Sequence, residues 1–165
     1  MTRVKTVLSG IRATGKLHLG NYLGALVRFA RMSTDPQYRC LFFVADLHTL
    51  TTLKDGEAIK ANLPAIILDY LAAGIDLSNS AIYAQSHVPQ VTELMWYLNC
   101  LTMVPDVLNE GAYKAKVVQD PTNNNVGLLT YPILMAADIL GPRAHLVPVG
   151  KDQKAHLELA AGLAR

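Results

Sequence analysis

Cysteines, net charge and long apolar runs are all scarce in this sequence, and each scarcity excludes a class of protein. The two cysteines, Cys40 and Cys100, lie in apolar stretches without metal-ligand spacing, which is typical of reduced thiols and predicts neither a disulfide framework nor a zinc site. No apolar run reaches about 18 residues and the N-terminus begins as a strand, so we expect no export, no membrane span and a cytoplasmic location. The net charge is +2 with scattered basic residues, so composition makes no case for a nucleic-acid-binding surface.

The rest of the composition is that of one globular domain. With 165 residues and 51% hydrophobic content, the chain is long enough to bury a sizeable core. Short apolar runs alternate with helical patterns, which predicts an α/β fold with a doubly wound parallel sheet. The predicted strands are 4–8, 40–45, 81–85 and 144–149. The run 40–45 is continuously apolar, as expected for a strand buried on both faces.

Helical spacing of apolar residues predicts the segments between and after these strands. A long helix is predicted over 55–73, with Gly74 as its stop and with a kink at Pro64 unless the missing hydrogen bond is compensated. Another follows Pro89, and its apolar stripe from Val91 to Thr102 is interpreted as core. Further helices are predicted over 126–140 and through 156–163.

The stretch from Ser9 to Gly24 joins the first strand to a helix. Its glycines allow close backbone approach, and a helix N-terminus favours negative charge, so the stretch predicts a phosphate site. Its first part, 10–16, matches a P-loop, but Leu17 stands where the Mg²⁺-binding Ser or Thr is required, which argues against a P-loop phosphohydrolase. His18 taken alone is better explained as a capping or core histidine.

Polar residues also follow the second and third strands, where open α/β sheets bind their ligands. Asp46 and His48 close the second strand, and Asp46 is also interpretable as a helix cap or loop carboxylate. His87 follows the third strand, where a solvated loop histidine explains it equally well. In the irregular portion 105–125, Lys114 and Lys116 are candidates for contacts with the phosphates of a ligand, or are solvated lysines on a short surface helix.

Two further blocks carry polar residues in apolar surroundings. Tyr131, Met135 and Asp138 project from one helical face, and a carboxylate among apolar residues must find a donor. An indole N–H of a bound tryptophan satisfies that need, and so does a backbone amide or Arg143. In the second block, Gly150 permits close approach by an adenosine and Asp152 can accept from a ribose hydroxyl, although Asp152 is equally placed to be an N-cap.

These blocks resemble the tryptophanyl-tRNA synthetase family of class I aminoacyl-tRNA synthetases. The string Ser-Gly-Ile-x-x-Thr-Gly-x-Leu-His-Leu-Gly-Asn-Tyr-Leu-Gly-Ala from Ser9 contains a His-x-Gly-His type motif with Asn21 in the last place. The string Leu-Leu-Thr-Tyr-Pro-x-Leu-Met-Ala-Ala-Asp-Ile-Leu around Asp138 resembles the family's specificity helix. A Gly-x-Asp-Gln element follows at Gly150.

The resemblance implies a Rossmann-like catalytic domain over residues 1–165 that activates tryptophan with ATP and Mg²⁺, then transfers it to tRNA(Trp). It also implies a homodimer, for which the helix from Val91 to Met103 is a candidate interface. The residues that it implies are the catalytic His18, Asn21 and Lys114; the ATP-binding Gly10, Arg12, His18, Gly20, Asn21, Gly150 and Asp152; and the tryptophan-binding Leu8, His48, Tyr131, Met135, Asp138 and Gln153.

The sequence departs from the family pattern in several places. Arg12-Ala13 stands where many members have Gln-Pro, and Lys151 replaces a frequent glutamate. The family's second lysine-bearing loop and its anticodon-binding domain would lie beyond Arg165, so we expect a truncated domain with an incomplete sheet on the C-terminal side. The alternatives are a non-catalytic fragment that binds tryptophan and ATP, and tyrosyl-tRNA synthetase-like activation.

Overall fold

A parallel sheet with helices on both faces organises the chain. The computed structural model describes residues 4–108 and 111–165. Among these residues, the strands β1 (Lys5–Arg12), β2 (Tyr38–Ala45) and β3 (Ser80–Ala84) form a sheet in the order β1-β2-β3. Gly10 pairs with Phe43, and a Cβ on Gly10 would lie 2.8 Å from the Phe43 carbonyl oxygen, so glycine is needed at this position.

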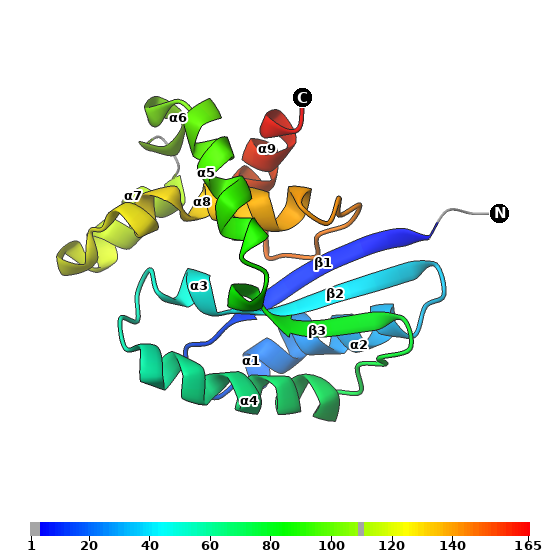
Figure 1. Cartoon of the computed structure of the whole chain (residues 1–165). Coiled ribbons are helices and arrows are strands. Elements are labelled where there is room, and N and C mark those ends of the chain that lie inside the picture. Colours follow the sequence, from blue (N-terminus) through cyan, green and yellow to red (C-terminus); the bar gives the residue numbers. More distant parts are fainter. Residues whose placement is uncertain (1–3, 109–110) are drawn as a thin grey trace.

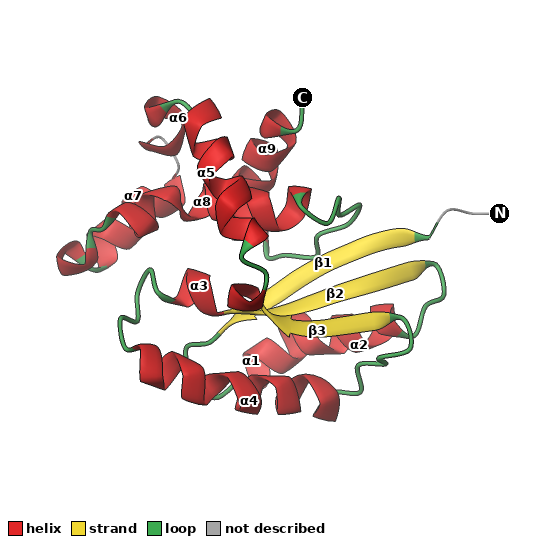
Figure 2. Cartoon of the chain, in the orientation of Figure 1, coloured by secondary structure: helices red, strands yellow, loops and turns green. Residues whose placement is uncertain are grey.

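The strands are joined by helices, as the alternating pattern predicts (Figures 1 and 2). The helices are α1 (Leu19–Asn21), a π-helical turn (Tyr22–Leu26), α2 (Val27–Ser33), α3 (Asp46–Thr49), α4 (Gly56–Ala72), α5 (Gln90–Leu101), α6 (Val104–Leu108), α7 (Gly111–Gln119), α8 (Val126–Leu140) and α9 (Lys154–Leu163), with 3₁₀ turns at Gln85–His87, Pro121–Asn123 and Lys151–Gln153. None of the helices in the described ranges is long and apolar enough to cross a bilayer.

The two faces of the sheet bury separate cores because side chains alternate along each strand. Phe42 and Val44 of β2 face α2 and α4, where Phe29 stacks on Phe42 with ring centroids 4.5 Å apart. Phe43 and Ala45 face the opposite side and pack with α5, α8 and α9. Figure 1 shows the two helical layers on either side of the strands. The continuous apolar run of β2 is thereby explained.

The predicted long helix is confirmed as α4. The Asp55 side chain accepts from the Ala58 N–H at 3.0 Å and caps its N-terminus. Gly74, at φ +87°, follows its C-terminal end. The helix continues through Pro64 without a break.

The predicted fourth strand is wrong. Segment 144–149 runs beside β1 but makes one parallel bridge, between Val7 and Leu146, in the described part of the chain. Pro148 has no N–H to donate, and its carbonyl accepts from the Ser9 hydroxyl at 2.9 Å. The segment is therefore fixed to β1 partly by a side chain, and a regular ladder does not form.

The length of β1 and the burial of α5 also differ from the sequence prediction. β1 continues to Arg12, past the predicted end at Leu8, because its C-terminal residues 9–12 still pair with β2. The apolar stripe of α5 is only partly core: Val91 and Leu98 are buried, whereas Leu101 is 70% exposed. The stripe is therefore divided between the core and the surface.

Candidate functional site

A cavity of about 460 Å³ lies at the carboxyl ends of β1 and β2. Its walls come from β1, β2, α3 and α8, from the π-helical turn and α2, from Lys116 of α7, and from the segment 147–153. Ligands of open parallel sheets bind at this edge. The volume suits a small-molecule ligand rather than a flat protein contact.

The structure brings most of the predicted site residues together in this cavity. The predicted residues that line it are Leu8, Gly10, Arg12, His48, Tyr131, Met135, Asp138, Gly150, Asp152 and Gln153. Those that do not line it, in the part of the chain described, are His18, Gly20, Asn21 and Lys114. Lys116, which the sequence offered together with Lys114 for phosphate contacts, is in the wall, whereas Lys114 is exposed.

His18 caps α1, as its alternative interpretation predicted. Its Nδ1 accepts from the Gly20 N–H at 3.0 Å, and the Asn21 side chain accepts from the His18 N–H at 3.0 Å. Because Nδ1 accepts, the proton of a neutral ring lies on Nε2. A Cβ on Gly20 would lie 2.9 Å from the His18 ring, so the small residue keeps this turn compact.

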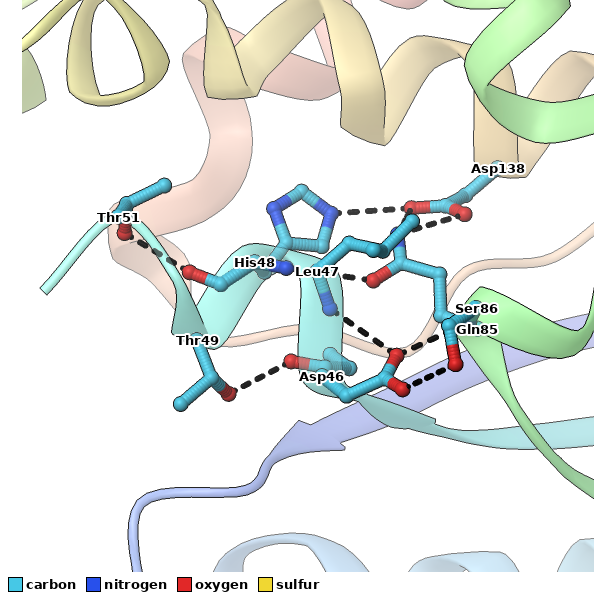
Figure 3. A network of polar contacts seen from close by, with 9 residues as sticks. Asp46, Leu47, His48, Thr49, Thr51, Gln85, Ser86 and Asp138 are labelled. Carbon is cyan, nitrogen blue, oxygen red and sulfur yellow. Dashed lines mark hydrogen bonds and ion pairs between the residues drawn. The ribbon is translucent and has the colours of Figure 1, made fainter. Parts of the chain in front are cut away.

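Asp138 is a buried carboxylate with side-chain partners from two other elements (Figure 3). Gln85 Nε2 donates to its Oδ1 at 3.0 Å and its Oδ2 at 2.8 Å. His48 Nε2 lies 2.9 Å from Oδ2. Among the described residues, its partners are thus neither Arg143 nor a backbone amide, the two candidates within the chain that the sequence offered beside a bound indole N–H. These donors offset the cost of burying the charge.

The one-turn helix α3 links the ends of neighbouring strands (Figure 3). Asp46 Oδ1 accepts from the Ser86 N–H at 3.0 Å, and its Oδ2 accepts from the Ser86 hydroxyl. Thr49 Oγ1 accepts from the Ala13 N–H at 2.8 Å and donates to the Ala45 carbonyl at 2.7 Å. Asp46 is therefore neither the N-cap of α3, which is Ala45, nor a loop residue: it is the first residue of α3, and its carboxylate holds the backbone of the turn after β3.

Two cationic side chains face the cavity near Tyr131. Lys116 Nζ lies 3.8 Å from the Tyr131 ring centroid, a cation–π contact. Burial lowers the pKa of Lys116, and the charge of Arg12 lowers it further. Arg12 itself donates to the Thr52 hydroxyl, and burial lowers its pKa too. Positive charge at a cavity wall favours an anionic ligand.

The Tyr131 hydroxyl lies 2.7 Å from His156 Nε2 in the interior. His156 is fully buried, and burial together with the charge of Lys116 lowers the pKa of its imidazole. A neutral imidazole and a phenol are a compatible donor and acceptor pair. This contact fixes the Tyr131 ring against the cavity, with its hydroxyl turned toward α9.

The last wall of the cavity is the turn from Gly150 to Gln153. Gln153 Nε2 donates to Asp152 Oδ2 at 2.6 Å. The N-cap position of α9 belongs to Gln153 and not to Asp152. The N-cap interpretation of Asp152 is therefore wrong, and its carboxylate lies in the cavity wall.

Sequence reasoning missed Gln85 as a partner of Asp138. A usable signal was present, because Gln85 directly follows the apolar third strand at the same edge as Asp46 and His48. Its pairing with Asp138, 53 positions away, depends on how α8 packs on the sheet. Spacing along the chain carries no information on that contact.

Comparison with known proteins agrees with these observations. The family model for tRNA synthetases class I (W and Y) matches residues 2–165. A tryptophan–tRNA ligase from Porphyromonas gingivalis is 49% identical over 162 residues, covering 98% of this chain and 49% of that protein. One from Nostoc sp. is 48% identical over 153 residues, covering 93% of this chain and 45% of that protein. The chain thus spans about half the length of the curated relatives it matches.

Solved structures share the fold. Tryptophanyl-tRNA synthetase from Campylobacter jejuni, complexed with ADP and tryptophan, has a TM-score of 0.90 and 38% identity, over 96% of this chain and 49% of that chain. Tyrosyl-tRNA synthetase from Archaeoglobus fulgidus, complexed with L-tyrosine, has a TM-score of 0.80 at 19% identity, over 94% of this chain and 49% of that chain, which shows the fold alone. The predicted doubly wound α/β fold is confirmed. Because the family model covers the chain almost from end to end, this chain belongs to the class I tRNA synthetases of the W and Y family.

Proposed function

We propose that residues 1–165 form the Rossmann-like catalytic domain of a tryptophan–tRNA ligase, which binds tryptophan and ATP. The observation that carries the proposal is Asp138, a buried carboxylate in the wall of a cavity that is otherwise largely apolar. An acceptor in apolar surroundings suits an aromatic ring that carries an N–H. The tryptophan–tRNA ligases among the relatives support the same assignment.

Tryptophan would occupy the side of the cavity formed by α8. Asp138 accepts from the indole N–H, Met135 packs on the ring, and Leu8 and His48 complete the wall. Tyr131 and Gln153 hold the ammonium and carboxylate end. Each of these side chains lines the cavity, and Asp138 is already oriented by its partners.

ATP would occupy the side formed by β1 and the turn at Gly150. Gly10 and Gly150 allow close approach of the nucleotide, Asp152 accepts from a ribose hydroxyl, and Arg12 contacts the phosphates. His18 and Asn21 stabilise the phosphates from the start of α1, where Gly20 leaves room for adenine. The sequence also assigned Lys114 to the phosphates. Because Lys116 lies in the cavity wall and Lys114 does not line the cavity, Lys116 is the stronger candidate for a phosphate contact.

The chemistry needs no nucleophilic side chain. A carboxylate oxygen of tryptophan attacks the α-phosphorus of ATP, and the bond to the pyrophosphate oxygen breaks. The products are tryptophanyl-adenylate and pyrophosphate. The chain contributes alignment of the two substrates and positive charge for the phosphates.

We infer that Mg²⁺ enters with ATP, held mainly by phosphate oxygens. In the described ranges there is no group of three or more His, Cys, Asp or Glu side chains that could hold a metal ion. We further infer that the complete protein transfers the tryptophanyl group to the 3′ end of tRNA(Trp), in the cytoplasm, where ATP and tRNA meet.

We also infer a homodimer through α5 and α6. These helices and the link between them expose a set of large apolar side chains, which we call the α5–α6 patch: Trp96, Tyr97, Leu101, Met103, Val104 and Leu108. Large apolar side chains that are exposed on neighbouring segments are typical of an interface. Light scattering should give twice the chain mass, and Leu101→Glu should give a monomer; Leu68→Glu, at an exposed leucine of α4, should remain dimeric. A dimer unaffected by Leu101→Glu would place the interface elsewhere.

The first test of function is ATP–pyrophosphate exchange with tryptophan, with tyrosine and with no amino acid. Exchange that requires tryptophan supports activation by these residues. Absence of exchange together with calorimetric binding of tryptophan identifies a binding fragment that does not complete the reaction. Exchange with tyrosine in place of tryptophan overturns the role of Asp138, and Asp138→Ala should weaken tryptophan far more than ATP.

A further inference from the structure

Gln85 is a buried polar residue to which the proposed function gives no role. It is fully buried at the start of the 3₁₀ turn after β3, and it is not among the described residues that line the cavity. Burying a primary amide without partners is costly. Within the part of the chain that the structure describes, the hydrogen bonds of its side chain go to residues 48 and 138, and both of those residues line the cavity.

The surroundings of Gln85 fix the orientation of its amide. Oε1 accepts from the His48 backbone N–H at 3.3 Å, while Nε2 donates to both oxygens of Asp138. A flipped amide would set its NH₂ against the His48 N–H and its oxygen against the carboxylate. A donor would then face a donor and an acceptor would face an acceptor, in place of favourable hydrogen bonds. The donor group of Gln85 therefore points at Asp138.

The backbone of Gln85 is held as well (Figure 3). The next residue, Ser86, gives its N–H and its hydroxyl to Asp46, and the Gln85 carbonyl accepts from the Val88 N–H at 3.0 Å. Asp46 and His48 both belong to α3. One short helix therefore holds Gln85 through its backbone neighbour and through its side chain.

These contacts also determine which acceptor site of Asp138 remains open. A carboxylate offers about four lone-pair sites. Gln85 takes one on each oxygen and His48 takes a second on Oδ2. In the network of described residues, the remaining site is on Oδ1.

We infer that Gln85 is a positioning residue that acts through Asp138 and sets the preference for an aromatic side chain carrying an N–H. The inference rests on the proposed function. With Gln85 in place, the Asp138 carboxylate is held in one orientation by two hydrogen bonds, with one oxygen available to an indole. Without Gln85, the carboxylate loses its fixed orientation, and an N–H donor on the ligand adds less to the binding affinity.

The test compares tryptophan with β-(3-benzothienyl)alanine, in which sulfur replaces the indole N–H, by calorimetry on this chain. Gln85→Met keeps the length of the side chain and removes its polar atoms. We expect tryptophan to bind about tenfold more weakly to this variant while the analogue changes by less than about twofold. Gln85→Glu keeps the acceptor for the His48 N–H but loses the donor, and should reduce the preference at least as much.

The ratio of the two affinities isolates positioning from folding, since a smaller folded fraction affects both ligands equally. Ser33→Ala is the matched control, because it removes a fully buried hydroxyl that accepts from the Asp76 N–H, away from the cavity. Its ratio should equal that of the unmodified chain. If the unmodified chain binds tryptophan and Gln85→Met leaves the ratio unchanged, this inference is overturned alone. If the unmodified chain binds no tryptophan, the proposed function fails, and this inference with it.

Discussion

The hydrogen bonds between Gln85 and Asp138 should be measurable as a coupling free energy in the ligand-free chain. Asp138→Ala removes the acceptor of a fully buried amide. Leaving such a donor unsatisfied costs about 1–3 kcal/mol, and each lost hydrogen bond to a charged group contributes about as much. Removing a buried carboxylate recovers part of this loss, since the charge no longer has to be desolvated.

The net expectation for Asp138→Ala is a loss of about 3 kcal/mol in the free energy of unfolding. For a domain of this size, that loss corresponds to a decrease of about 6–12 °C in Tm. Gln85→Met should cost a similar amount, because a buried carboxylate then keeps fewer donors. The double variant should lose at least about 1.5 kcal/mol less than the sum, because neither partner is left unsatisfied.

Urea unfolding followed by circular dichroism measures all three variants and the unmodified chain. A second cycle that combines Asp138→Ala with Ser33→Ala provides the control, since Ser33 lies at the end of α2 and should be additive. Additivity of Asp138→Ala and Gln85→Met within about 0.5 kcal/mol would refute the reasoning. It would mean that these contacts contribute nothing to the folded state.

Three further predictions concern separate parts of the chain. Lys116→Met should weaken ATP binding about tenfold in calorimetry, because Lys116 lies in the cavity wall. Lys114→Met, at an exposed lysine, should have little effect. Equal losses of ATP affinity in the two variants would contradict the placement of Lys116 in the wall. Phe42→Ala should lower the free energy of unfolding by about 3–5 kcal/mol, measured by urea unfolding, because it removes a buried ring that stacks on Phe29. A loss under about 1 kcal/mol would be inconsistent with that packing. Burial lowers the pKa of His156 in the folded chain, so the unfolded chain binds a proton more readily. The free energy of unfolding should therefore fall as the pH decreases from 6.5 through the folded pKa. His156→Asn should lose this dependence, and an unchanged pH profile in that variant would exclude His156 as its source.

The sequence was sufficient for features that depend on local periodicity. The helix over 56–72 was predicted within one residue at each end, because Asp55 and Gly74 are local signals that act on their own helix. The cavity was also largely predictable, since its walls come from motifs whose strand ends must meet at one edge of a parallel sheet.

The failures have a common physical origin in contacts between distant segments. The predicted strand at 144–149 has the right composition, but Pro148 lacks the N–H that a ladder needs and the segment makes one bridge. The apolar side of α5 was assigned to the core, because periodicity does not say which neighbour covers a face; Leu101 is in fact exposed. The contact between Gln85 and Asp138 was not predicted for the same reason, since only the packing of α8 on the sheet brings the two side chains together.

Helix α3 has a consequence for how this chain tolerates changes in length. Within four residues, its side chains reach three different elements: Asp46 reaches the turn after β3, His48 reaches α8, and Thr49 reaches the end of β1. Successive residues of a helix differ in direction by about 100°. An insertion or deletion inside α3 would redirect every later side chain at once, and no compensating point substitution could restore all three contacts. A segment that looks like an ordinary connection between a strand and a loop is therefore fixed in length as strictly as a buried strand.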